Sequence, residues 1–106
     1  MVYGSVFAPG LFAGKVIIVT GGGSGIGRCV AHELASLGAQ VALVGRKIEK
    51  LQKVADEITQ DGGKVSFQVC DIRQEEAVKQ TVAAIMGEHG PVDGLVIAAN
   101  AANVEG

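Results

Sequence analysis

Residues 20–27 read Thr20-Gly21-Gly22-Gly23-Ser24-Gly25-Ile26-Gly27, and this stretch decides the fold of the 106-residue chain. The residues before it, 15–20, form a short run rich in β-branched side chains, which is typical of a strand buried on both faces. In the residues that follow, 26–37, apolar side chains recur at steps of three and four, which predicts an amphipathic helix. The apolar stripe of this helix consists of Ile26, Cys29, Val30, Leu34 and Leu37. The glycines therefore form the turn between a strand and a helix.

The same unit of strand and helix recurs along the rest of the chain. Further strands are expected at 40–44, 64–70 and from 93 to 98 or 99. A second helix is expected from 48 to its end near 61–63, and a third around 77–86, ended by Gly87, Gly90 and Pro91. The second helix has a stripe of Ile48, Leu51, Val54, Ala55 and Ile58, the third strand alternates Val65, Phe67 and Val69, and the third helix carries Ala77, Val78, Thr81, Val82, Ile85 and Met86. This alternation with short connections predicts an α/β fold with a parallel sheet and helices on both faces.

The spacing of the glycine-rich turn is T-G-x-x-x-G-x-G, with Gly21, Gly25 and Gly27 as its fixed glycines. Glycines at such a turn allow the backbone to come close to a pyrophosphate, and the helix N-terminus supplies free N–H groups and the positive end of its dipole. The expected ligand is therefore a dinucleotide. A plain glycine-rich turn without a ligand is the alternative structural interpretation.

Two other nucleotide-binding loops can be tested against the same glycines. A P-loop requires G-x-x-x-x-G-K-[ST], and Arg28-Cys29 stand where the lysine and the hydroxyl are needed, so this class fails. A methyltransferase-like G-x-G-x-G can be drawn through Gly23, Gly25 and Gly27. Such a site requires a carboxylate after the second strand, and Gly45-Arg46 stand there. This disfavours the methyltransferase interpretation without excluding it.

The residues after the second and third strands indicate which dinucleotide fits. A carboxylate after the second strand would bind the ribose 2′-hydroxyl, whereas an arginine accommodates a 2′-phosphate through charge-assisted hydrogen bonds. Arg46 and Lys47 stand there, so NADP(H) is favoured over NAD(H). After the third strand, Asp71 is expected to accept a hydrogen bond from the adenine amino group, and Ile72 to cover the ring. The alternative role of Asp71 is the N-cap of the following helix.

Composition excludes several other classes of protein. Hydrophobic residues make up 48% and charged residues 19%, so the chain is too apolar for intrinsic disorder, and it has no apolar run long enough to span a membrane. A net charge of -2 without a run of Lys or Arg argues against nucleic acid or anionic lipid as a partner. Cys29 and Cys70 have no metal-ligand spacing and are expected to be buried, reduced thiols of a cytoplasmic protein.

Four sites in register resemble a short-chain dehydrogenase/reductase. They are the glycine-rich turn at 20–27, Gly45-Arg46, Asp71-Ile72, and Asp93-Gly94-Leu95-Val96 at the start of the fourth strand. The leader at 8–15 further resembles the branch of enoyl-CoA and dienoyl-CoA reductases. The resemblance implies a Rossmann-like sheet, here with its first four strands in the order 3-2-1-4 and three helices. It also implies hydride transfer between NADP(H) and a carbonyl, an alcohol or an enoyl group.

The resemblance further implies a set of cofactor-binding residues. They are Gly21, Gly23, Ser24, Gly25, Ile26 and Gly27 for the pyrophosphate and ribose, Arg46 and Lys47 for the 2′-phosphate, Asp71 and Ile72 for the adenine, and Asn100 beneath the nicotinamide ribose. The family usually has N-N-A-G after the fourth strand. Either Ile97-Ala98-Ala99-Asn100 or, with three extra residues, Asn100-Ala101-Ala102-Asn103 takes that place here.

No catalytic or metal-binding residue is assigned within the chain. The resemblance places the family's catalytic serine, asparagine and Tyr-x-x-x-Lys pair beyond residue 106. The chain's one tyrosine, Tyr3, has no lysine at position 7. His32 and His89 are expected to be surface histidines, on the outer side of the first helix and in the turn before the fourth strand.

These expectations define the organisation of the chain. Residues 1–14 are interpreted as an N-terminal arm, and 15–106 as a partial NADP-binding Rossmann domain of a longer, homo-oligomeric enzyme with a small-molecule substrate. The 106 residues alone are expected to be inactive. Leu95 and its neighbours on the fourth strand are expected to expose apolar side chains that a fifth strand would cover. The alternative function is a non-enzymatic dinucleotide-binding module.

Overall fold

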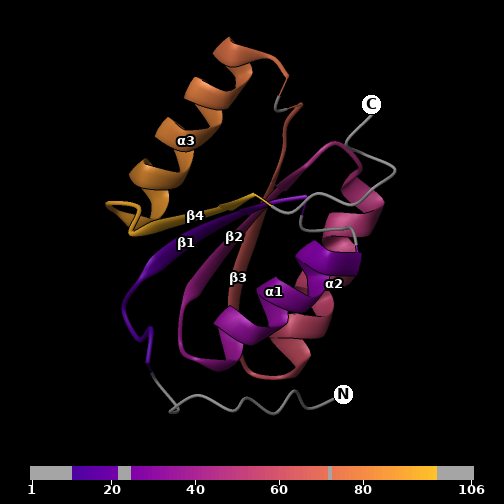
Figure 1. Cartoon of the computed structure of the whole chain (residues 1–106), viewed down its shortest axis with the longest axis vertical. Helices are drawn as coiled ribbons and strands as arrows, with labels where there is room; N and C mark the ends of the chain where they lie inside the picture. Colours follow the sequence, from indigo (N-terminus) through magenta and orange to yellow (C-terminus); the bar gives the residue numbers. More distant parts are fainter. Residues whose placement is uncertain (1–10, 22–24, 72, 98–106) are drawn as a thin grey trace.

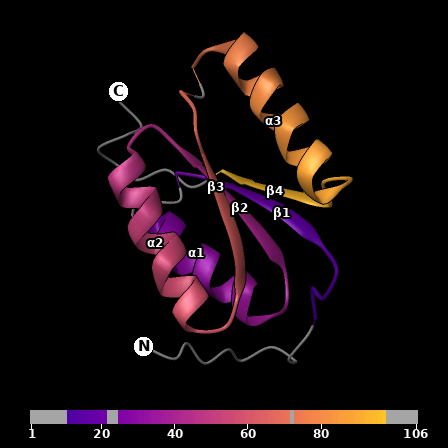
Figure 2. The same cartoon turned by 180° about the vertical axis from the view of Figure 1, so that it is seen from behind.

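The computed structural model describes residues 11–21, 25–71 and 73–97, in which strands and helices alternate. Their bounds are β1 Val16–Thr20, α1 Gly25–Ser36, β2 Gln40–Gly45, α2 Ile48–Gln60, β3 Lys64–Val69, α3 Glu75–His89 and β4 Gly94–Ile97. The strands form one parallel sheet in the order β3-β2-β1-β4. Helices α1 and α2 cover one face of the sheet and α3 covers the other (Figures 1 and 2). The predicted fold class and strand order are confirmed.

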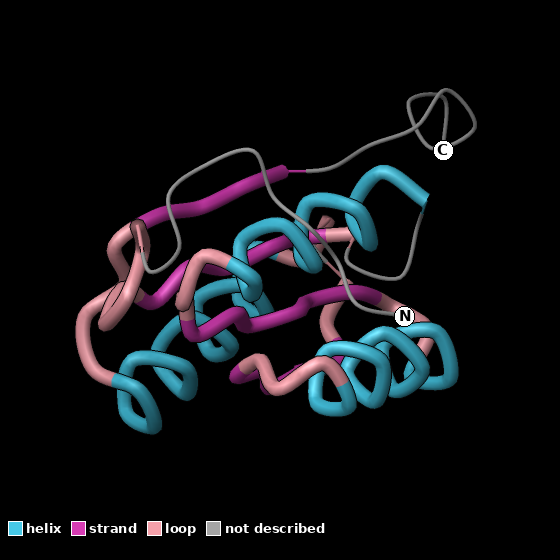
Figure 3. The backbone as a smooth tube through the Cα atoms, turned by 90° about the horizontal axis from the view of Figure 1, so that it is seen from below, coloured by secondary structure: helices cyan, strands magenta, loops and turns pink. Residues whose placement is uncertain are grey.

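Two apolar cores lie on the two faces of the central strands. Successive residues of a strand point to opposite faces, so a strand with helices on both sides must be apolar at every position. The first core joins Ile17, Val19, Val41 and Leu43 to Ala31 of α1 and to Leu51, Val54, Ala55 and Ile58 of α2. The second joins Val16, Ile18, Ala42 and Val44 to Cys70 and to Ile85 of α3. The strands therefore form the central layer of the molecule, with helices around it (Figure 3).

The apolar stripe predicted for α1 is only partly the face that packs against the sheet: Leu34 packs against the first core and Leu37, just after the helix, is buried. Gly27 and Ala31 are buried, whereas Ile26 is 52% exposed and Cys29 is also exposed. The predicted stripe is wrong at Ile26 and Cys29, and so is the expectation that Cys29 is buried. A glycine and an alanine on the inner face allow the helix backbone to lie close to the sheet.

Smaller departures from the predicted core occur near the ends of other elements. Ile48 at the start of α2 and Met86 near the end of α3 are exposed, although both belong to the predicted stripes. Val69, the last residue of β3, is 52% exposed. Strand β3 lies at the edge of the sheet and pairs with β2 alone, so it is covered less completely than β1 and β2.

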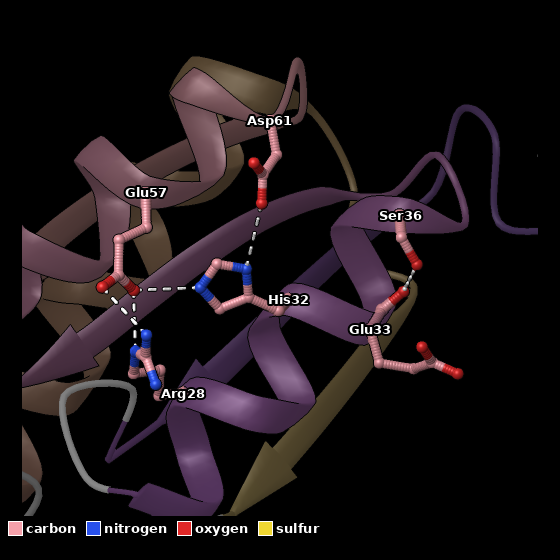
Figure 4. A network of polar contacts seen from close by, with 6 residues as sticks. All are labelled: Arg28, His32, Glu33, Ser36, Glu57 and Asp61. Atoms are coloured by element: carbon pink, nitrogen blue, oxygen red, sulfur yellow. Dashed lines mark hydrogen bonds and ion pairs between the residues drawn. The ribbon is translucent and has the colours of Figure 1, made fainter. Parts of the chain in front are cut away.

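Both histidines have surroundings that differ from those predicted. His32 lies between α1 and α2 with a side chain only 5% exposed, and its Nε2 is 3.0 Å from Oε1 of Glu57 (Figure 4). His89 is the last residue of α3 rather than part of the following turn, and its Nε2 is 3.0 Å from Oγ of Ser66. Each ring has a polar partner more than twenty residues away in sequence, which is why periodicity alone could not place it.

The described end of the predicted N-terminal arm packs onto the domain. The N–H of Phe12 donates to the carbonyl of Leu37 at 2.8 Å, and the side chain of Phe12 packs against the first core. Residues 1–10 lie outside the described part of the chain. Within 11–21, 25–71 and 73–97, no helix has the length and apolar character that crossing a membrane requires.

We expect Glu57→Gln to destabilise the fold and to make its free energy of unfolding less dependent on acidic pH. Arg28 donates two hydrogen bonds to Glu57, which lowers the pKa of this carboxyl from 4.5 to about 2. Ionised Glu57 therefore stabilises the fold above pH 4.5, and this contribution is lost as the pH falls toward 2. At neutral pH the substitution should cost about 1 kcal/mol, because the pair is partly exposed to solvent. Urea unfolding at neutral pH and near pH 3 measures both effects.

Asp56→Asn is the matched control for this measurement. It removes the same charge from the neighbouring residue, whose carboxylate accepts one exposed hydrogen bond from Gln52. A difference between Glu57→Gln and the unmodified protein that stays the same at both pH values would contradict the role of the ionised carboxylate.

Candidate functional site

The carboxyl ends of the strands bring the predicted site segments to one edge of the sheet. Thr20 is paired with Val44 on one side and with Ile97 on the other, and Gly45 is paired with Val69. Hydrogen bonds continue just past the strands: the N–H of Gly21 donates to Val44 O at 2.8 Å, and that of Cys70 to Gly45 O at 2.7 Å. The residues that follow β1, β2 and β3 therefore begin side by side.

The glycine-rich turn leaves β1 through a residue with a positive φ. Gly21 has φ +70°, a conformation that residues with a side chain rarely adopt, and α1 begins at Gly25. A Cβ added at Gly25 would meet no atom within 4 Å, so there is open space beside the first residue of the helix. Of the predicted site residues, Gly23 and Ser24 lie outside the described part of the chain, as does Gly22.

Two cations stand between the end of β2 and the start of α2. Arg46 and Lys47 are both exposed, and Lys47 occupies the N-cap position of α2 without a side-chain capping hydrogen bond. Leu51 packs onto Gly45, where an added Cβ would lie 3.2 Å from Leu51 Cδ2, so the helix starts close to the strand end. Positive side chains at a helix N-terminus are unfavourable to the dipole. Their placement here suits an anionic ligand at this edge.

The carboxylate of Asp71 is held by a neighbour that sequence reasoning missed. The backbone N–H and Nε of Arg73 both lie 3.0 Å from Oδ1 of Asp71, and Nη2 lies 2.9 Å from Oδ2. These bonds lower the pKa of Asp71 to about 2, and the charge of Arg46 adds a smaller effect in the same direction. The signal that could have found this pair is an arginine two residues after the aspartate.

The alternative role of Asp71 as the N-cap of α3 is wrong. The N-cap residue of α3 is Gln74, and Asp71 accepts the N–H of Gln74 through its backbone carbonyl at 3.0 Å. Its carboxylate instead accepts the hydrogen bonds from Arg73. The predicted bond to adenine remains a prediction, and Ile72 lies outside the described residues.

Strand β4 completes this edge. The hydroxyl of Thr20 donates to the carbonyl of Val96 at 3.3 Å, a contact that ties the ends of β1 and β4 together. At the opposite end, Asp93 precedes the strand, and its Oδ2 accepts the N–H of Val16 at 2.8 Å. The predicted exposure of the fourth strand is confirmed at Leu95, which is 60% exposed. Asn100 and both possible positions of the family's N-N-A-G lie outside the described residues.

A cavity of about 240 Å³ lies between the strands and α3, on the face of the sheet opposite to α1 and α2. It is lined by Ile18, Thr20, Val44, Cys70, Val78, Thr81, Val82, Ile85 and Leu95. This lining is mostly apolar and includes none of the predicted cofactor-binding residues, so it does not suit a phosphate. Among residues 11–21, 25–71 and 73–97, no cluster of three His, Cys, Asp or Glu side chains could hold a metal ion.

Comparison with known proteins agrees with the geometry of the strand edge. The profile of the family described as short chain dehydrogenase matches residues 15–105. A short chain dehydrogenase of Pseudocercospora fijiensis is 44% identical over 95 residues, which are 90% of this chain and 31% of that protein. A 3beta-hydroxysteroid dehydrogenase of Mediterraneibacter gnavus is 40% identical over 94% of this chain and 35% of its own length. The chain thus spans about a third of the length of these relatives.

Solved structures that share the fold range from 35% to 67% identity among the three compared below. A citronellol catabolism dehydrogenase of Pseudomonas aeruginosa PAO1 is 67% identical with a TM-score of 0.86, over 88% of this chain and 39% of that one. An actinorhodin polyketide ketoreductase with NADPH is 35% identical with a TM-score of 0.78, over 81% of this chain and 33% of its own. An NAD+-bound xylitol dehydrogenase is 38% identical with a TM-score of 0.77, over 79% of this chain and 38% of its own. Similar structures therefore include complexes with either nicotinamide dinucleotide.

We expect Gly21→Ala and Gly25→Ala to differ in their effect on stability. Alanine at position 21 would have to adopt φ near +70°, which costs about 1 to 2 kcal/mol. Alanine at position 25 meets open space and stands in a helix, so the stability should stay the same or rise slightly. Urea unfolding without nucleotide measures both variants, and equal losses would contradict the difference in backbone conformation.

Proposed function

Because the chain belongs to the short-chain dehydrogenase family, we propose that it is the cofactor-binding part of an NADP(H)-dependent oxidoreductase. The observation that carries this proposal is the pair of exposed cations, Arg46 and Lys47, at the end of β2 beside the turn that starts at Gly21. The described residues fit a dinucleotide. There is open space at Gly25, the start of a helix faces the same edge, and positive charge stands where a 2′-phosphate would bind.

Each segment of the edge has its own role in this proposal. The turn and the start of α1 bind the pyrophosphate, with Gly21 and Gly25 allowing its close approach. The guanidinium of Arg46 pairs with the 2′-phosphate, and Lys47 adds a second positive charge. Asp71, already ionised and oriented by Arg73, accepts the adenine amino group at the end of β3. Gly23, Ser24, Ile26, Gly27, Ile72 and Asn100 complete the proposed set.

The chemical step belongs to the longer protein. A bound nicotinamide supplies or accepts a hydride, and the second reactant is a carbonyl compound, an alcohol or an enoyl compound. Within these 106 residues no Tyr-x-x-x-Lys pair occurs, so the proton-transfer residues are assigned to other parts of the protein. A homo-oligomeric state and a cytoplasmic location belong to the same proposal.

Arg46→Ala should weaken binding of NADPH far more than binding of NADH. A charge-assisted hydrogen bond contributes about 1.5 to 3 kcal/mol, so the affinity for NADPH should fall about tenfold or more. NADH lacks the 2′-phosphate and should bind almost as before. Lys47→Ala should also weaken NADPH binding more than NADH binding, but by a smaller factor. Titration calorimetry on the intact protein measures the four affinities, and equal losses for both cofactors would overturn the 2′-phosphate assignment.

Gly25→Ala is the matched contrast for this experiment. Its added methyl group would enter the space proposed for the pyrophosphate, which NADPH and NADH share. Both affinities should therefore fall by the same factor, whereas Arg46→Ala should separate them.

Turnover by the intact protein distinguishes an enzyme from a binding module. NADPH oxidation should be assayed with carbonyl compounds and enoyl thioesters, and NADP+ reduction with alcohols. Citronellol belongs in the panel because a protein that is 67% identical over the shared part is named a citronellol catabolism dehydrogenase. Hydride transfer with any of these substrates supports the proposal. Tight NADPH binding without turnover across the panel would favour the non-enzymatic module.

A further inference from the structure

An ion-pair network joins the two helices that begin at the proposed cofactor site. Helix α1 starts at Gly25, directly after the glycine-rich turn, and α2 starts at Ile48, directly after Arg46 and Lys47. Figure 4 shows Glu57 of α2 facing Arg28 and His32 of α1. The network therefore connects the element that follows the turn with the element that follows the two cations.

The contacts of Glu57 are directional. Nε of Arg28 lies 2.7 Å from its Oε1 and Nη2 lies 3.0 Å from its Oε2, which is the two-pronged geometry of an arginine with a carboxylate. Nε2 of His32 lies 3.0 Å from the same Oε1. Because Arg28 and His32 are four residues apart, they stand one turn apart on one face of α1, and Glu57 holds both.

The network has a buried side at His32 and an exposed side at Arg28, whose side chain is 42% exposed. The side chain of His32 is 5% exposed, and those of Glu57 and Asp61 are 25% and 18% exposed. Asp61, just after α2, approaches the other ring nitrogen of His32, with Oδ2 3.7 Å from Nδ1. Around the buried His32 ring the network contacts little water, and its hydrogen bonds favour one relative orientation of the two helices.

We propose that Glu57 is a positioning residue for the cofactor site. Through Arg28 and His32 it holds α1 against α2 and thereby sets the spacing between the pyrophosphate-binding turn and the cations that receive the 2′-phosphate. The apolar contacts between these helices and the sheet have no directional preference of their own, whereas the two-pronged bonds to Glu57 favour one orientation of α1 relative to α2. This inference rests on the proposed function, because it concerns NADPH, which binds both parts at once.

The test compares Glu57→Gln with Asp56→Asn in the intact protein, using NADPH and NADH as ligands. Both substitutions remove one negative charge from α2, which by itself favours the more anionic NADPH. Glu57→Gln should nevertheless lower the affinity for NADPH by about tenfold relative to NADH, a coupling of ordinary size for sites joined by a network. Asp56→Asn should leave the ratio unchanged. Arg28→Lys keeps the charge, loses the two-pronged geometry, and should shift the ratio in the same direction as Glu57→Gln.

A double-substitution cycle shows whether the effect reaches the cations. In an Arg46→Ala background, Glu57→Gln should cause no further change in the ratio of NADPH to NADH affinity. The guanidinium that Glu57→Gln would move relative to the 2′-phosphate is absent from that background. A lower melting temperature with an unchanged ratio in both Glu57→Gln and Arg28→Lys would overturn the inference and leave Glu57 a purely structural residue. If the unmodified protein binds neither dinucleotide, it is the proposed function that fails.

Discussion

Parallel pairing of β1 with β2 and β4 is the constraint on which the rest of the structure depends. It places Thr20, Val44 and Ile97 side by side, so that the chain leaves each strand at the same edge of the sheet. An antiparallel β2 would have put Arg46 at the opposite end from Gly21. The same pairing requires a helix to return the chain after every strand, and these helices cover both faces. The continuous apolar character of β1 and β2 and the grouping of the polar site residues thus have one cause.

The sequence predicts the elements and their order well, because strand and helix periodicities are local properties. The face that α1 turns to the sheet was predicted correctly at Leu34 and wrongly at Ile26 and Cys29. Hydrophobicity favours the larger side chains, whereas close packing on the sheet selects Gly27 and Ala31. His32 was misplaced for a related reason: its partner Glu57 is 25 residues away in sequence, and no local pattern reports it.

The residues proposed to bind the cofactor were chosen from motifs whose spacing is local, and Gly21, Arg46 and Asp71 among them lie just past the ends of β1, β2 and β3. What escaped prediction is the bond of Asp71 to Arg73, which joins two residues in the connection between β3 and α3. The bond has an electrostatic consequence. The negative charge of Asp71 is partly balanced by Arg73, so Arg46 and Lys47 keep their positive field toward an anionic ligand.

The cavity beneath α3 affects how readily that face of the sheet opens. The face under α3 contains a hollow of about 240 Å³ bordered by the exposed Leu95. Atoms that line a hollow lack part of their dispersion contacts, and an edge strand such as β4 has a neighbour on one side alone in the described sheet. Amide hydrogens of α3 and β4 would accordingly exchange with solvent through local openings, while those of β1 and β2 would exchange only when the whole fold opens.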